Sequence, residues 1–207
     1  MEDVLDVYAR PYDVENPVVC FDESPKQLVS EIRKPYIGKD GIKYEDCEYK
    51  REGAAELMMI TEPLGGKREV LVRENHTGIT WALIIAYIVE TMYPKAKIVT
   101  LVMDNLSAHK VHNLYKVFEP SRARAIRDRL EIIYTPKHGS WLNIAECELS
   151  VLSRQALKKR FASKEELEIQ VKAWAAQRND LQKGVDWQFT TNDARIKLKN
   201  LYPTVLT

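Results

Sequence analysis

The chain has 207 residues, of which 45% are hydrophobic and 29% are charged, and its formal net charge is +1. This is the composition of an ordinary globular protein and not of a disordered chain, and the length allows one large domain or two small ones. No apolar run approaches the roughly 18 residues that a membrane-spanning helix needs, so we predict no membrane partner. The acidic N-terminus is unlike a secretory signal, and three cysteines without metal-ligand spacing favour a reducing, cytoplasmic location.

Charge is distributed unevenly along the chain. Residues 1–23 hold seven acids and one base, whereas residues 150–200 hold eleven Lys or Arg against six Asp or Glu. Such a basic stretch is either a solvated helical surface or a face that binds a polyanion, and the sequence leaves both open. Residues 1–17 are polar and contain two prolines, and we interpret them as an N-terminal arm.

Apolar runs rich in β-branched residues predict strands at 18–21, 49–61 and 67–73, with a turn at 63–66 between the last two. The charged segment 26–48 is interpreted as an excursion. A long apolar helix is predicted at 77–93, and the strongest strand signal follows at 97–103.

The second half of the chain alternates helices with one further strand. We predict a helical segment at 107–129 interrupted at Pro120, a strand at 130–134, and helices at 143–161, 163–179 and 191–201. Ser163 and Glu166 have the spacing of a capping box. The order of the elements predicts a mixed α/β fold, in which three early strands form an antiparallel sheet and later strands alternate with helices.

Three acids stand at the boundaries of predicted elements. Asp22 closes the first strand, Asp104 closes the strand at 97–103, and Glu146 lies near the start of the helix at 143–161. Charged groups are rarely placed against buried strands without a partner, and a group of carboxylates suits Mg²⁺ or Mn²⁺. Two such ions can activate a water and stabilise the leaving oxygen of a phosphodiester. The alternative is that these acids are turn or cap residues.

Periodicity leaves two choices open among these acids. Glu146 and Glu148 lie on opposite sides of the apolar stripe of one predicted helix, at similar angles from its centre. Asp22 and Glu23 point to opposite faces of a strand. Spacing alone selects neither member of either pair.

The segment before Glu146 has an unusual composition for a loop that only connects two elements. It combines a proline and a glycine with hydrogen-bond donors and Trp141, which would suit a loop that positions phosphates. His109 lies five residues after Asp104 and is a candidate for the same edge of the sheet, whereas His76 and His112 are interpreted as surface or packing residues. The polar side chains of the loop that are candidates for DNA contact are Lys137, His138, Ser140 and Asn143. On the basic helices that follow, the candidates are Arg154 and Lys158.

Taken together, three segments resemble the signature of DDE transposases of the insertion-sequence-630 family, which is related to mariner elements. They are Cys20-Phe-Asp22-Glu-Ser, Val102-Met-Asp104-Asn105-Leu-Ser-Ala-His109 and Thr135-Pro-Lys-His-Gly-Ser-Trp-Leu-Asn143-Ile-Ala-Glu146. The ordered set, with 41 residues between Asp104 and Glu146, is far more specific than any one of its parts. The likeness continues to about residue 203, so residues 18–203 would form the catalytic domain.

The resemblance implies an RNase H-like α/β fold with a mixed central sheet flanked by helices, and metal-dependent cleavage and joining of DNA strands. It implies Asp22, Asp104 and Glu146 as ligands of Mg²⁺ or Mn²⁺, with two ions in the family pattern, and its Asn143-x-x-Glu146 spacing favours Glu146 over Glu148. Residues implied to support these ligands from behind are Glu23, Asn105 and His109.

The implied substrates are the inverted-repeat ends of a mobile element and target double-stranded DNA, with a homodimer on the DNA and a nucleoid-associated location when bound. Members of the family also carry an N-terminal helix-turn-helix region, and residues 1–17 cannot form one, so that region is expected to be encoded separately or missing. Two alternatives remain at this point: a catalytically silent DNA-binding or assembly fragment, and another RNase H-like nuclease.

Overall fold

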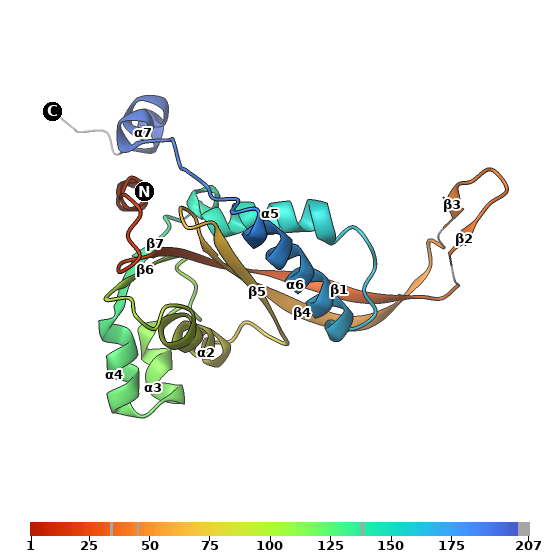
Figure 1. Ribbon diagram of the computed structural model, residues 1–207, viewed down its shortest axis with the longest axis horizontal. Coiled ribbons are helices and arrows are strands. Elements are labelled where there is room, and N and C mark those ends of the chain that lie inside the picture. Colours follow the sequence, from red (N-terminus) through yellow and green to blue (C-terminus); the bar gives the residue numbers. More distant parts are fainter. Residues whose placement is uncertain (34, 45, 138, 203–207) are drawn as a thin grey trace.

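The computed structural model describes residues 1–202 except 34, 45 and 138. Its centre is a five-stranded sheet with the order β5-β4-β1-β6-β7 (Figure 1). Strands β1, β4 and β5 pair antiparallel, whereas β1, β6 and β7 pair parallel, so the predicted mixed sheet with an antiparallel early half is confirmed. The strands are β1 (Val18–Glu31), β4 (Tyr49–Glu62), β5 (Lys67–Arg73), β6 (Val99–Met103) and β7 (Leu130–Tyr134).

Helices cover both faces of the sheet. One face packs on α2 (Gly78–Tyr87), which continues as the π-helical turn η1 (Ile88–Met92), and on α3 (Leu114–Val117) and α4 (Pro120–Asp128). The other face packs on α1 (Glu2–Tyr8), α5 (Ile144–Ala156) and α6 (Lys164–Asp180). The remaining short elements are η2 (Val111–Asn113), η3 (Ser140–Leu142), α7 (Thr191–Lys197) and η4 (Lys199–Leu201).

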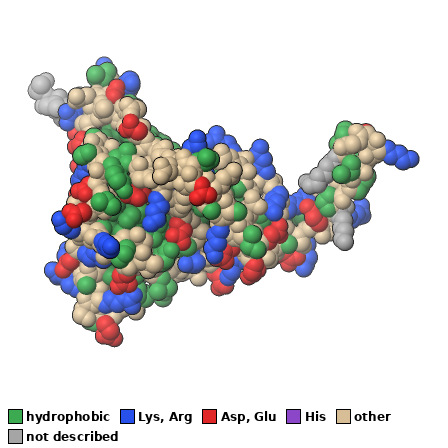
Figure 2. Space-filling view, in the orientation of Figure 1, with side chains coloured by type: hydrophobic (Ala, Val, Ile, Leu, Met, Phe, Trp, Pro, Cys, Tyr) green, Lys and Arg blue, Asp and Glu red, His purple; other side chains and the backbone are tan. Residues whose placement is uncertain are grey.

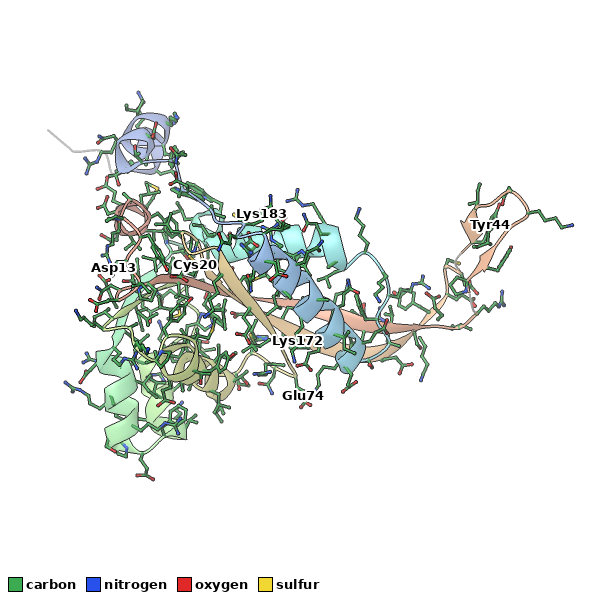
Figure 3. The ribbon with its side chains drawn as sticks, viewed as in Figure 1. Asp13, Cys20, Tyr44, Glu74, Lys172 and Lys183 are labelled. Atoms are coloured by element: carbon green, nitrogen blue, oxygen red, sulfur yellow. The ribbon has the colours of Figure 1, made fainter. Side chains whose placement is uncertain are left out.

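The alternation of side chains along β1 divides the core into two clusters. Cys20 belongs to the cluster under α5 and α6, and its neighbour Phe21 belongs to the cluster under α2. Cys20 lies within the body of the molecule, far from the label of Tyr44 (Figure 3). All five residues of β6 are buried, as expected of a parallel strand covered on both faces. No helix among the described residues is both long enough and apolar enough to cross a membrane.

The first strand and the excursion after it differ from the prediction. β1 does not end near residue 21 but runs to Glu31, paired throughout with β4, and the two strands leave the body of the molecule together (Figure 1). β6 pairs only with residues up to Cys20, so the outer part of β1 is an edge strand, where Pro25 is tolerated. A small hairpin of β2 (Tyr36–Ile37) and β3 (Lys43–Tyr44) forms the tip, where Tyr44 lies (Figure 3).

The segment predicted as a polar arm contains a helix that belongs to the core. In α1 the side chains of Val4, Leu5, Val7 and Tyr8 are buried, whereas its acids Glu2, Asp3 and Asp6 are half-buried or exposed. The Tyr8 hydroxyl donates to the carbonyl of Leu142 at 2.8 Å and lies 3.3 Å from Cys20 Sγ. The high acid content concealed an amphipathic helix of two turns.

Two predicted helical segments are divided or shortened, and one predicted helix cap is only half formed. The segment 107–129 consists of η2, α3 and α4, and α5 ends at Ala156 instead of residue 161. The helix ends because backbone carbonyls after Ala156 accept hydrogen bonds from β1 instead of from the helix. Lys26 Nζ donates to the carbonyl of Leu157, and the Val29 N–H donates to the carbonyl of Phe161. Ser163 accepts the Glu166 N–H at 3.2 Å, as the capping box requires, but the Glu166 carboxylate accepts from Ala162 N–H and not from Ser163.

Candidate active site

An open cleft of about 820 Å³ brings the three predicted acids together. Asp22 comes from β1, Asp104 follows the last residue of β6, and Glu146 lies in the first turn of α5. The register explains the first two: Cys20 pairs with Val102, and Asp22 and Asp104 each lie two residues further along these parallel strands. The sequence predicted that Asp22 ends the first strand. In the structure Asp22 lies within the long strand β1.

Asp22 lies in an environment that disfavours its charge. Burial, together with the negative charges of Glu23, Asp104 and Glu146, raises the pKa of this carboxyl group to about 7, although a hydrogen bond from the Glu23 N–H acts to lower it. Burial and nearby like charges both favour the protonated form of a carboxyl group. A positive charge brought into the cleft would therefore be strongly stabilised here.

Asn143 ties the third acid to the first. Its side-chain carbonyl accepts the Ala145 N–H at 3.1 Å and so caps the start of α5. Its amide nitrogen donates to the Phe21 carbonyl at 2.8 Å and contacts Asp22 Oδ2 at 3.3 Å. Asn143 is buried, and it fixes the N-terminus of α5, which carries Glu146, against β1.

His109 contacts Asp104 and also Glu23, whose side chain leaves the face of β1 opposite to that of Asp22. Its Nδ1 lies 2.6 Å from Asp104 Oδ1 and its Nε2 lies 3.2 Å from Glu23 Oε2, and only 2% of its side chain is exposed. The ring forms a T-shaped contact with Phe21 and a stacked contact with Trp81. Burial alone would lower the pKa of His109, but hydrogen bonds and charges from Asp104 and Glu23 raise it to about 9.

The two glutamates of α5 have different surroundings. Glu146 lines the cleft, and its Oε2 is buried without a hydrogen-bond partner among the described residues. Glu148 is buried on another side of the helix, where it lies 3.1 Å from Arg68 and 2.9 Å from Arg178. Glu148 thus belongs to a buried ion cluster, and only Glu146 faces Asp22 and Asp104 across the cleft.

The residues expected to contact DNA are not all in one place. Ser140 and Asn143 line the cleft, whereas Lys137 is exposed on the loop before it. His138 lies outside the described residues. Asn105 is exposed and accepts a hydrogen bond from Lys110, and none of the described hydrogen bonds joins its side chain to Asp104.

Most cations of the basic C-terminal stretch are neutralised by the chain itself. Ion pairs join Arg160 to Glu31, Lys164 to Glu74, Lys172 to Glu168, Arg178 to Glu148, Arg195 to Glu2 and Lys197 to Asp193. Arg154 and Lys158 are exposed and form no ion pair with any acid that the structure describes. In Figure 2, blue and red side chains are interspersed over the visible face rather than gathered into one basic patch.

Sequence reasoning missed the serines that line the cleft. Ser150 and Ser153 follow Glu146 at intervals of four and seven residues, so all three lie on one face of α5. Helical periodicity measured from Glu146 would have identified them. Ser24 lies two residues after Asp22 on the same face of β1 and also lines the cleft.

The side chains of the cleft fit a hard divalent cation. The three acids supply only oxygen donors, and the unpartnered Glu146 oxygen and the raised pKa of Asp22 mark uncompensated negative charge. No three Asp, Glu, His or Cys side chains within the described ranges stand close enough together to enclose an ion as they are placed. The like charges of carboxylates favour such separation.

Comparisons with known proteins agree with this geometry. The family model described as DDE superfamily endonuclease matches residues 17–168. A comparison with curated protein sequences gives no match.

Among solved structures, the Mos1 mariner paired-end complex with Mn has a TM-score of 0.56 at 18% identity, covering 88% of this chain and 54% of that chain. The Mos1 strand transfer complex has a TM-score of 0.59 at 17% identity, covering 88% and 54%. The Mos1 paired-end complex with Mg has a TM-score of 0.59 at 16% identity, covering 98% and 61%. The chain thus spans little more than half of these proteins. The likeness shows that its fold is the predicted RNase H-like fold.

Proposed function

The chain belongs to the DDE superfamily of endonucleases, and we propose that it is the catalytic domain of a transposase of the insertion-sequence-630 family. It would cut DNA strands at the ends of its element and join them to target DNA. The observation that carries this proposal is the convergence of Asp22, Asp104 and Glu146, from three separate elements, on one cleft.

The three acids are the residues that would hold Mg²⁺ or Mn²⁺, with two ions expected. Bound ions would supply a Lewis acid for the phosphodiester and an activated water or 3′-hydroxyl. The chain's own residues hold this arrangement: Asn143 bridges β1 and the start of α5, and the hydroxyl groups of Ser140, Ser150 and Ser153 border the cleft, where they can donate to phosphate oxygens.

Support for DNA as the substrate comes from the similar structures, which are those of Mos1 in a mariner paired-end complex and in a strand transfer complex. By that analogy the chain would act on inverted-repeat ends and target duplex DNA, as a homodimer, together with a helix-turn-helix region that reads the ends. A bacterial cytoplasmic, nucleoid-associated location would follow from such a substrate.

The test is strand cleavage of a labelled duplex carrying candidate inverted repeats in Mg²⁺ or Mn²⁺, beside Mn²⁺ binding measured by electron paramagnetic resonance. Asp104→Asn keeps an oxygen that can meet His109 but removes the charge, so we expect cleavage below detection and weakened Mn²⁺ binding. Asp186→Asn is the matched control, because Asp186 is exposed and does not line the cleft.

Mn²⁺ binding by Asp104→Asn equal to that of the unmodified protein would overturn the metal assignment. Mn²⁺-dependent nicking that persists in this variant would overturn the catalytic one. Joined strand-transfer products distinguish a transposase from a nuclease that only hydrolyses, and the binding measurement stands without any added N-terminal region.

A further inference from the structure

The His109 imidazole lies between two carboxylates from different strands, with one ring nitrogen directed at each. Asp104 contributes only its Oδ1 to this contact. We propose that His109 is a positioning residue that holds the Asp104 carboxylate in one orientation, tethered through Glu23 to β1, so that Oδ2 stays available for a divalent cation. This inference rests on the proposed function and names a residue on which its metal affinity depends.

Asp104 needs such support because its own surroundings do not fix it. It follows the last residue of β6, where the ladder of the sheet ends, and 34% of its side chain is exposed. The one other described contact to its carboxylate is a long one, from the Leu106 N–H at 3.4 Å. A carboxylate so placed can rotate about its side-chain bonds unless a hydrogen bond holds one oxygen.

His109 itself is held on every side. The backbone N–H of His109 donates to the Leu106 carbonyl at 3.1 Å, and the backbone carbonyl of His109 accepts from the Tyr134 hydroxyl at 3.0 Å. The rings of Phe21 and Trp81 pack against the imidazole, with centroid distances of 5.5 and 6.2 Å. The imidazole is therefore a rigid spacer of fixed direction between the two carboxylates.

The tether also joins the acids of neighbouring strands. Glu23 follows Asp22 on β1, so its side chain leaves the opposite face of the sheet and reaches His109 from there. Through Glu23 and His109, the position of Asp104 becomes linked to that of Asp22. Hydrogen-bonding partners behind metal ligands orient them in this way, and their loss typically lowers metal affinity about 10–100-fold.

A pair of substitutions separates positioning from packing. The amide nitrogen of His109→Asn lies near the place of Nδ1 and can still donate to Asp104, whereas that of His109→Gln lies near the place of Nε2 and can reach only Glu23. Both variants lose the aromatic ring, so a role in packing alone would affect them alike. The probe is Mn²⁺ alone, titrated by electron paramagnetic resonance, with thermal unfolding of the metal-free protein as the second readout.

We expect His109→Gln to bind Mn²⁺ about 10–100-fold more weakly, and His109→Asn to retain affinity within a few-fold, with similar unfolding temperatures for the two. Equal affinities in the two variants, whether both reduced or both unchanged, would overturn the proposal. Glu23→Gln removes the charged partner of Nε2 but leaves the contact between His109 and Asp104. Like His109→Asn, it should therefore bind Mn²⁺ within a few-fold of the unmodified protein, and a loss as large as that of His109→Gln would contradict the positioning of Asp104 by His109.

Two reference variants keep this test distinct from that of the proposed function. His76→Asn replaces an exposed histidine that contacts Glu56 and should bind Mn²⁺ normally. Asp104→Asn should bind weakly. Normal binding by Asp104→Asn would refute the metal site itself, whereas weak binding there with equal His109 variants would refute only the positioning role.

Discussion

Helix α5 carries two glutamates whose surroundings are opposite in charge. Glu148 is 2% exposed and contacts the guanidinium groups of Arg68 and Arg178, of which Arg68 is also 2% exposed. Glu146, two residues earlier, faces Asp22 and Asp104 and forms no ion pair with any cation that the structure describes. One carboxylate is neutralised by the fold, and the other is left uncompensated by it.

The difference shows how to separate a structural charge from a functional one. A buried charge without a partner costs free energy, so a fold keeps one only where something else compensates it. The ion cluster joins β5, α5 and α6, since its members come from all three elements. It thereby sets the rotation of α5 that leaves Glu146 in the cleft.

The largest effect on stability is expected at the ion cluster. Glu148→Gln leaves two arginines buried or half-buried without a counter-charge, and breaking a buried ion pair in this way costs about 3–5 kcal/mol. Urea unfolding followed by circular dichroism measures the loss. Glu146→Gln is the matched control on the same helix, and it should leave the free energy of unfolding unchanged or slightly raised.

A similar loss of stability in both glutamate variants would contradict the comparison. It would mean that Glu146 is compensated in the folded protein by contacts that the cleft geometry does not show. Loss of Mn²⁺ binding in Glu146→Gln without loss of stability would sharpen the distinction, because it separates the two functions of one helix.

The features that could be predicted from the sequence are those set by residues close together in the chain. The buried strand β6 and the alternating strand β5 follow from apolar pattern, and the family spacing favoured Glu146 over Glu148, as the cleft does. The catalytic roles of the three acids remain a prediction, as do the roles of the DNA-contact residues.

What the sequence concealed depends on contacts between distant segments. Glu148 meets Arg68, which is 80 positions away in sequence, and no periodicity within α5 contains that partner. The outer part of β1 is extended only because β4 pairs with it. Helix α1 could not be predicted from its acidic composition. Its apolar residues are buried only because they pack on a core cluster to which α5 also contributes.

An intermediate effect is expected at the helix cap that faces the cleft. Asn143→Ala removes the N-cap of α5, which costs about 0.5–2 kcal/mol, and also removes the contacts to Phe21 and Asp22. Ser163→Ala removes the N-cap of α6 at a place that does not line the cleft. Both variants should lose stability by urea unfolding, Asn143→Ala the more because it also loses the buried hydrogen bond to the Phe21 carbonyl, but only Asn143→Ala should weaken Mn²⁺ binding. Equal Mn²⁺ affinities would show that Asn143 is a cap alone.

The smallest effect is expected where cations remain exposed near the cleft. Arg154 lies one residue beyond Ser153 on α5, and Lys137 lies on the loop before Ser140. If each contacts a phosphate, each alanine variant should weaken binding of duplex DNA and reduce the slope of log affinity against log salt by about 1. Lys172→Ala is the control, because Lys172 is paired with Glu168 at 2.7 Å on α6. Because its ammonium group is already paired with a carboxylate, it neutralises no phosphate and releases no counterion from the DNA, so the salt slope of its variant should match that of the unmodified protein. Equal slopes for all three variants would place the DNA path elsewhere, whereas a lower slope only near the cleft would extend the contrast between compensated and uncompensated charge from acids to bases.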